Sequence, residues 1–320
     1  MGSCAHGHDC VRYRRSRDAM RTIVMTGASR GIGRAALHRF AAQPHTHVVL
    51  LGRSTRERSA LRGRRVHADL SSMRSVDAAA EEVAELVGSG RLPPIEALVL
   101  NAGVQHTNAL TETVDGLEST FAVNVLANHI LLTRLRSHLS STARIVVTVS
   151  DTHFGDFRHN LAMVPGPKWQ PVERLARVGA FPDPASVSAG RTAYSTSKLA
   201  AIYLVHEHVR RFPSGPSILS YNPGFVPGTS LARDADAVSR FAMRWIMPLL
   251  TLTPLATTPA RAGRLLTDTA LGAVAAPNGA YIDRDRAAQS SPESYDAVRE
   301  QHTWEVVEAI VAEVLQRPTT

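Results

Sequence analysis

Short runs of apolar residues alternate along the chain with longer segments in which apolar residues recur every three to four positions. The short runs contain many β-branched residues, which is typical of buried strands, whereas the longer segments have the period of helices. The predicted strands cover residues 22–25, 48–51, 65–68, 95–100, 145–149 and 218–221. The predicted helices cover residues 32–43, 72–88, 114–139, 193–212 and 292–315.

This alternation predicts βαβ units, in which a helix connects two parallel strands. We therefore expect an α/β fold: a single-domain, doubly wound parallel sheet with helices on both faces, spanning residues 21–320. Sheets of this class bind ligands at the ends of their strands, so we expect the functional residues there.

Three segments do not follow the alternation. Residues 152–191 are rich in Pro and Gly and are predicted to form a loop beside the functional site. Residues 228–259 are apolar and are predicted to form a substrate lid, with a dimer patch or a membrane-contacting segment as the alternatives. Residues 1–20 are polar and Arg-rich, which predicts a disordered N-terminal extension.

The composition is that of an ordinary soluble protein, with 44% hydrophobic and 20% charged residues in a chain of 320. The net charge of +8 could indicate a nucleic-acid partner, but the Arg residues are scattered and do not alternate with aromatic residues. We therefore predict a small anionic ligand and no nucleic acid. No apolar stretch is long enough for a transmembrane segment and no secretory signal is recognisable, so we expect a cytoplasmic protein.

Both cysteines of the chain, Cys4 and Cys10, lie in the N-terminal extension near His6 and His8. Their spacing matches no standard zinc pattern, so no metal site is predicted. The rest of the chain has no thiol nucleophile.

A glycine-rich segment at residues 26–33 follows the first predicted strand and opens the first helix. Glycines allow the backbone to turn sharply there, and a helix N-terminus offers free N–H groups to a pyrophosphate. This context predicts a dinucleotide site formed by Gly27, Ser29, Arg30, Gly31, Ile32 and Gly33.

The end of the second strand indicates which dinucleotide binds. An acidic residue there usually holds the ribose of NAD, whereas an arginine accommodates the 2′-phosphate of NADP. This chain has Arg53 and no carboxylate at that place, and Arg30 adds a second cation. The prediction is NADP(H), with NAD as the alternative.

Polar residues also follow the other predicted strands. Asp69 and Leu70 follow the third strand, Asn101, Ala102 and Gly103 follow the fourth, and Ser150 ends the fifth. We expect the first two groups to contact the dinucleotide, because the carboxyl ends of parallel strands meet at one edge of the sheet.

Tyr194 and Lys198 are four residues apart in a predicted helix, so they share one face of it. A nearby cation favours the phenolate, which predicts that Lys198 lowers the pKa of Tyr194 and makes it a usable acid or base. Lys168 and Lys198 are the two lysines of a chain that otherwise uses arginine, which indicates a specific role for a compact point charge.

Taken together, these motifs resemble the short-chain dehydrogenase/reductase family over about residues 21–283. The resemblance is carried by residues 26–33, Asp69, residues 101–103, Asn124, Ser150, Tyr194 with Lys198, and residues 222–224 in that order. It is closer to the retinol-dehydrogenase-like and protochlorophyllide-reductase-like branch, through residues 98–105, 121–124, 149–153 and 222–232. The fold that it implies is the Rossmann fold.

The resemblance also implies roles for individual residues. Tyr194 would exchange a proton with the substrate oxygen, and Lys198 would hold the nicotinamide ribose. Ser150 would orient the carbonyl, and Asn124 would anchor a water linked to Lys198. The remaining cofactor contacts implied by the resemblance are Pro223, Gly224, Val226 and Thr229.

One feature departs from the family pattern. Members often carry two adjacent serines, and here Asp151 occupies the second place, so Thr152 is the alternative to Ser150.

The implied enzyme is an NADP-dependent carbonyl reductase that acts on a hydrophobic ketone or aldehyde, or oxidises the alcohol. The alternatives are an enone C=C reductase and a non-catalytic NADP(H)-binding sensor. A homodimer through the long helix and the Tyr194 helix remains open.

Overall fold

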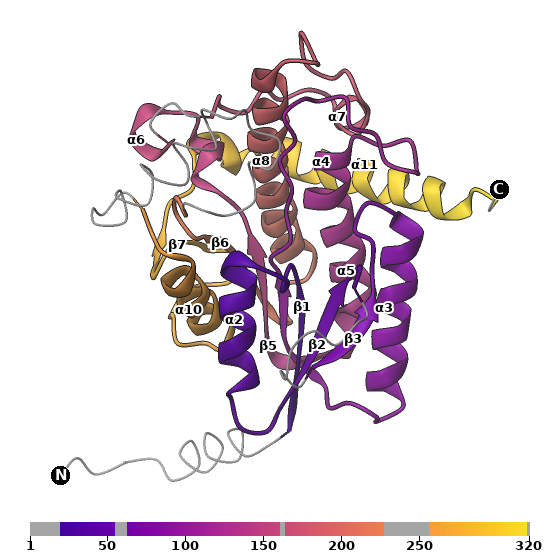
Figure 1. Cartoon of the computed structure of the whole chain (residues 1–320), viewed down its shortest axis with the longest axis vertical. Coiled ribbons are helices and arrows are strands. Elements are labelled where there is room, and N and C mark those ends of the chain that lie inside the picture. Colours follow the sequence, from indigo (N-terminus) through magenta and orange to yellow (C-terminus); the bar gives the residue numbers. More distant parts are fainter. Residues whose placement is uncertain (1–19, 55–62, 161–163, 227–255, 319–320) are drawn as a thin grey trace.

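A single sheet of eight strands organises the computed structural model, which describes residues 20–54, 63–160, 164–226 and 256–318 (Figure 1). The strand order is β3-β2-β1-β4-β5-β6-β7-β8, and every neighbouring pair is parallel except β7 with β8. The strands are β1 (Arg21–Thr26), β2 (Thr46–Gly52), β3 (Arg64–His67), β4 (Ile95–Leu100), β5 (Leu139–Thr148), β6 (Ser217–Asn222), β7 (Tyr281–Asp283) and β8 (Arg286–Ala288).

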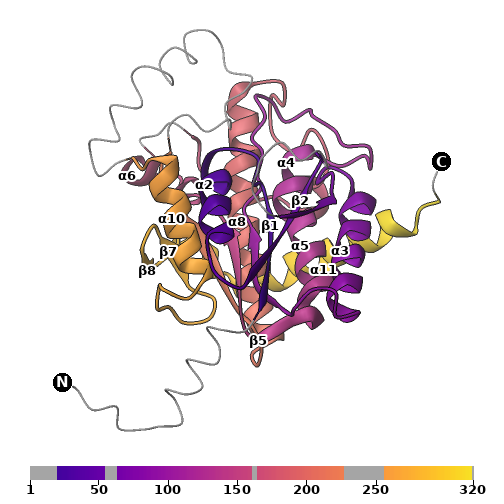
Figure 2. The same ribbon diagram turned by 60° about the horizontal axis from the view of Figure 1, so that its bottom comes forward.

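Helices cover both faces of this sheet. One face packs against α2 (Gly31–Ala41) and α10 (Pro259–Ala270), and the other against α3 (Met73–Gly88), α5 (Ala127–Leu135) and α8 (Val187–Arg211). Figure 2 shows α2 beside α10 on one side of the sheet and α3 beside α5 on the other. The long C-terminal helix α11 (Ala297–Gln316) packs against α8 and α3. The predicted doubly wound α/β fold is confirmed.

The pattern of strand residues explains the two layers. In β1, Ile23 and Met25 enter the core on the side of α2 and α10, whereas Val24 enters the core on the opposite side. Side chains alternate along a strand, so a strand covered on both faces must be apolar at every position. This is why the strands appear in the sequence as continuous apolar runs.

The order of the strands reverses between β1 and β4. The chain proceeds outward from β1 to β2 and β3, then returns to β4 and continues in the other direction. Loops at the carboxyl ends of β1 and β4 therefore diverge to opposite faces and leave a crevice, where sheets of this class bind ligands.

The helix predicted at residues 114–139 is wrong at both ends. The helical segment begins at Ser119, because the Glu118 side chain accepts a hydrogen bond from Phe121 N at 2.7 Å and caps it. It continues from α4 (Ser119–Phe121) through a π-helical turn (Ala122–Leu126) into α5 and a final 3₁₀ turn (Arg136–His138). Strand β5 already begins at Leu139.

The predicted loop at residues 152–191 contains more structure than expected. It includes a 3₁₀ turn (Asp151–Phe154), α6 (Phe157–Asn160), α7 (Val172–Leu175) and the first turn of α8. Helix α8 begins earlier than predicted because the Ser186 hydroxyl accepts a hydrogen bond from Ala189 N at 3.1 Å.

The C-terminal part also differs from the prediction. Residues Pro292–Tyr295 form a 3₁₀ turn, and α11 begins only at Ala297, where Asp296 caps it. Helix α10 and the strands β7 and β8 were not predicted from the sequence.

Some predictions lie outside the described residues: nearly all of the N-terminal extension, Thr229 and most of the lid at residues 228–259. Within the described ranges, no helix has both the length and the apolar character needed to cross a lipid bilayer. The same ranges contain no group of three or more His, Cys, Asp or Glu side chains placed to hold a metal ion.

Candidate active site

The glycine-rich loop between β1 and α2 is a tightly packed backbone turn. Gly27 and Gly31 have φ angles of +71° and +54°, a region that other residues rarely adopt. A Cβ at Gly33 would lie 2.1 Å from the Gly27 carbonyl oxygen, so the helix starts directly against the loop. No side chain caps the first turn of α2 at Arg30, and no acidic residue lies in that turn. Its backbone N–H groups are suited to an anion.

Asn101 connects this loop to the end of β4 by hydrogen bonds. Its Nδ2 donates to the Gly27 carbonyl at 3.3 Å, and its backbone N–H donates to Thr26 Oγ1 at 3.1 Å. Ala102 N donates to the same hydroxyl at 3.0 Å. The predicted residues of the β1 and β4 ends thus form one connected surface at the crevice.

The polar and charged residues predicted to hold the cofactor lie in the β1–α2 loop and after β2 and β3. Ser29, Arg30 and Arg53 are exposed, so both guanidinium groups are accessible to a ligand. Asp69 is only half-buried. Burial would raise the pKa of its carboxyl, but hydrogen bonds from the Ser71 hydroxyl and N–H, together with the nearby Arg53 charge, hold that pKa below its ordinary value.

Lys198 is buried between the ends of β4 and β5. Its Nζ donates to the Thr148 carbonyl at 2.8 Å, and burial lowers its pKa to about 8. A Cβ at Gly103 would lie 3.3 Å from both Lys198 Nζ and Asn124 Oδ1. Gly103 therefore allows the lysine and the asparagine to approach the end of β4 closely.

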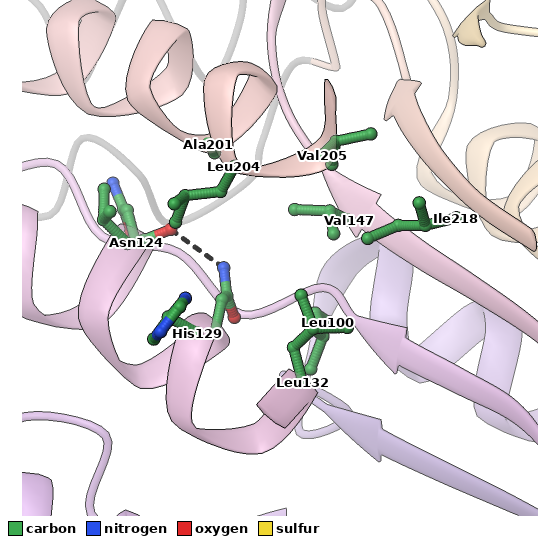
Figure 3. A pocket seen from close by; sticks show the side chains of 11 residues that line it. Leu100, Asn124, His129, Leu132, Val147, Ala201, Leu204, Val205 and Ile218 are labelled. Carbon is green, nitrogen blue, oxygen red and sulfur yellow. Dashed lines mark hydrogen bonds between the residues drawn. The ribbon is translucent and has the colours of Figure 1, made fainter. Parts of the chain in front are cut away.

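Asn124 connects this strand end to α8. Its Oδ1 accepts a hydrogen bond from Val104 N at 2.9 Å, and its Nδ2 donates to the Val104 carbonyl and to Ser197 Oγ at 3.0 and 2.9 Å. Its own carbonyl accepts from Asn128 Nδ2 at 2.8 Å. Figure 3 shows the small cavity between the sheet, α5 and α8 that Asn124 lines together with Leu204. These bonds fix the π-helical turn against the helix of Tyr194 and Lys198.

The relation between Tyr194 and Lys198 differs in part from the prediction. They share one face of α8, and Lys198 Nζ lies 5.5 Å from the centroid of the Tyr194 ring. Tyr194 is 6% exposed, however, and burial raises the pKa of its phenol above the ordinary value, while a hydrogen bond with Ser150 opposes this. The lysine therefore does not dominate the acidity of the phenol, which stays protonated at neutral pH.

Ser150, rather than the alternative Thr152, contacts the phenol of Tyr194. Ser150 caps the 3₁₀ turn that follows β5, and its Oγ accepts a hydrogen bond from Thr152 N at 3.3 Å. The Thr152 hydroxyl is buried and makes no hydrogen bond among the described residues. Of the two candidate hydroxyls, the one of Ser150 therefore lies against the phenol.

His153 is a further residue of this turn, and no role was predicted for it from the sequence. Its Nδ1 lies 2.5 Å from the Ser150 carbonyl, and its Nε2 accepts from Ser291 N at 3.1 Å. Burial lowers the pKa of His153 to about 4, so the ring is neutral and can donate at Nδ1 while accepting at Nε2. It holds the serine turn against the segment before α11.

The end of β6 completes the site. Pro223 and Val226 are buried, and Gly224 has a φ of +72°. Asn222 Oδ1 accepts from Gly224 N at 3.1 Å and from Asp151 N at 3.2 Å, which ties this turn to the one after β5.

The structure thus brings Asn124, Ser150, Tyr194 and Lys198 together at the carboxyl edge of the sheet, next to the glycine loop. The arrangement offers the hydroxyls of the buried Tyr194 and of the partly exposed Ser150 for a proton and a hydrogen bond. It also offers a cation and an anion-binding turn for a nucleotide. This is suited to proton and hydride chemistry at a carbonyl group.

Comparison with known proteins agrees with this arrangement. The family model "short chain dehydrogenase" matches residues 21–161. DnrU of Streptomyces sp. strain C5, a candidate daunorubicin C-13 ketoreductase, is 31% identical in an alignment of 309 positions that covers 92% of this chain and 93% of DnrU.

Solved structures of the same fold include a short-chain dehydrogenase from Burkholderia cenocepacia in complex with NADP. It has a TM-score of 0.54 and 22% identity, over 82% of this chain and 95% of that one. The NADPH-bound carbonyl reductase from chicken fatty liver has a TM-score of 0.56 and 16% identity, over 85% and 94%. At this level of identity the likeness establishes the fold.

Proposed function

Because the chain belongs to the short-chain dehydrogenase family of oxidoreductases, we propose that it is an NADPH-dependent reductase of ketones or aldehydes, with Tyr194 as proton donor. The alcohol could be oxidised in the reverse direction. The observation on which the proposal rests is the contact between the Tyr194 phenol and Ser150 beside the buried Lys198.

The β1–α2 loop fits a dinucleotide. The first turn of α2 has N–H groups without a side-chain cap. A Cβ at Gly27 or Gly33 would come within 2.8 Å of neighbouring protein atoms, so glycine is what lets the loop pack directly against the start of that helix. The exposed Arg30 and Arg53 supply positive charge for a 2′-phosphate, which favours NADP(H) over NAD. Two neighbours of the same fold were solved with NADP or NADPH, in line with this choice.

When bound, the cofactor supplies the hydride that reduces the carbonyl carbon. The Tyr194 phenol is protonated at neutral pH, since its pKa lies above the ordinary value of a tyrosine, so it can give its proton to the oxygen as negative charge develops there. Ser150 contacts that phenol and would orient the carbonyl by a hydrogen bond. The Lys198 ammonium would bind the nicotinamide ribose and stabilise the phenolate left after the proton transfer.

The proposed substrate is a small hydrophobic carbonyl compound. Residues 228–259, which follow the Gly224 turn, include the apolar side chains Phe241, Trp245 and Leu250 in the sequence. The name of DnrU, a candidate daunorubicin C-13 ketoreductase, supports a ketone as the substrate.

A panel of hydrophobic ketones, aldehydes and enones, incubated with NADPH while its absorbance is followed, tests the function. We expect loss of NADPH with at least one ketone or aldehyde, and an alcohol as the product. A saturated ketone formed from an enone would instead assign the enzyme to C=C reduction. Binding of NADPH without turnover of any member would favour a sensor.

A further inference from the structure

We propose that Asp151 is a positioning residue that determines whether the Ser150 hydroxyl donates its hydrogen bond to the carboxylate or to the substrate oxygen. Carbonyl reduction would therefore depend on the protonation of this carboxyl group. The inference rests on the proposed function and adds to it a residue that lies behind the reacting atoms.

Asp151 is held by one hydrogen bond at its backbone and one at its side chain. Its backbone N–H donates to Asn222 Oδ1 at 3.2 Å, and its Oδ1 accepts from Ser150 Oγ at 3.3 Å. The residue is 9% exposed. A serine hydroxyl has a single proton to donate, so a carboxylate that accepts it competes directly with a substrate carbonyl.

Several charged and titratable groups face this carboxyl. Burial raises the pKa of Asp151 to about 6, Arg284 lowers it, and Asp283 raises it. His159 of α6 acts to lower the pKa of Asp151, and the phenols of Tyr194 and Tyr281 lie near enough to respond to the carboxylate. The carboxyl therefore changes its charge within the pH range in which most enzymes work.

Protonation changes the hydrogen bonds around Ser150. A protonated Asp151 can donate to Ser150 Oγ, which frees the serine proton for the substrate oxygen. An ionised Asp151 keeps accepting the hydrogen bond of the serine hydroxyl. Its charge also raises the pKa of the Tyr194 phenol, which weakens that proton donor. Asp151 forms no covalent bond during the reduction. The carbonyl receives the cofactor's hydride and the Tyr194 proton, and Asp151 only exchanges a proton with water.

The test is the dependence of kcat on pH between about pH 5 and about pH 9, at saturating ketone and NADPH. The variants are Asp151→Asn and Asp151→Ser, with Glu173→Gln as the control. Glu173 is an exposed carboxylate in α7 and is not among the groups that act on the pKa of Asp151. Wild type and control should lose at least about threefold in kcat as the pH rises through about 6, and both Asp151 variants should lose that inflection.

An inflection that persists unchanged in a folded Asp151 variant would overturn the inference. Thermal melts identify the folded variants, and Asp151→Ser replaces Asp151→Asn where the latter fails to fold. Carboxyl ¹³C NMR of the wild type supplies a readout without turnover: the signal lost in the variant should titrate near pH 6, and titration near 4 would refute the inference. A wild type that reduces no carbonyl compound would refute the proposed function itself.

Discussion

Gly33 lies against the carbonyl of Gly27 so closely that a Cβ at Gly33 would be 2.1 Å from that oxygen. This contact joins the first turn of α2 to the end of β1. It leaves the backbone, rather than side chains, as the surface that meets a pyrophosphate.

Gly33→Ala should therefore displace the loop and weaken NADPH binding by at least about tenfold, with a loss of roughly 1–3 kcal/mol in the free energy of unfolding. Isothermal titration and urea unfolding measure the two effects. Gly215→Ala is the matched control, because a Cβ there would meet no atom closer than 4.0 Å. Equal NADPH affinity in the two variants would argue against a dinucleotide on this loop.

Arg53 should determine the choice of cofactor. Asp replaces its positive charge with the carboxylate that a ribose 2′-hydroxyl prefers, so Arg53→Asp should raise KM for NADPH at least about tenfold and lower KM for NADH. Steady-state kinetics with both cofactors measure this. Arg39→Asp, an exposed site in the last turn of α2, controls for net charge. An unchanged preference in Arg53→Asp would show that Arg53 does not contact the 2′-phosphate.

His208 should make the protein less stable in acid. It is 1% exposed, and burial lowers its pKa to about 4, below the 6.5 of an ordinary histidine. Between these two values the unfolded chain binds a proton that the folded chain does not, so stability is lost as the pH falls from 6.5 towards 4.

His208→Gln should remove this pH dependence of stability. Between about pH 7.5 and about pH 4.5, the free energy of unfolding of wild type should therefore fall by roughly 2 kcal/mol more than that of the variant. Urea unfolding at the two pH values measures it, and His38→Gln on the exposed side of α2 is the control. Parallel pH dependences of wild type and His208→Gln would contradict the assignment.

Much of the fold could be predicted, because strands buried on both faces must be apolar throughout. The runs at residues 48–51 and 97–100 show this directly. The strands β7 and β8 are three residues each, too short for a periodic signal. The start at Ser119 depends on capping by Glu118, and local hydrophobic periodicity does not reveal that bond.

The residues of the candidate site could be named from the sequence, but the pKa values of their side chains could not. The spacing of Tyr194 and Lys198 follows from helix geometry. The pKa of the phenol depends instead on burial by residues distant in the sequence. Asp151 was recognisable in the sequence only as a departure from the paired serines of the family. Its surroundings were not, because Asn222 and Arg284, which bind its backbone and act on its charge, lie at the end of β6 and just after β7 and are distant in the sequence.

The most direct test of the account compares Tyr194→Phe with wild type on one accepted ketone, following NADPH oxidation and NADPH binding in parallel. The phenol hydroxyl is the proposed proton source, and general acid catalysis contributes typically 10²–10⁴-fold. We predict a fall in kcat of at least about a hundredfold, with the dissociation constant for NADPH changed by less than about threefold. Turnover in Tyr194→Phe close to that of wild type would contradict the central claim.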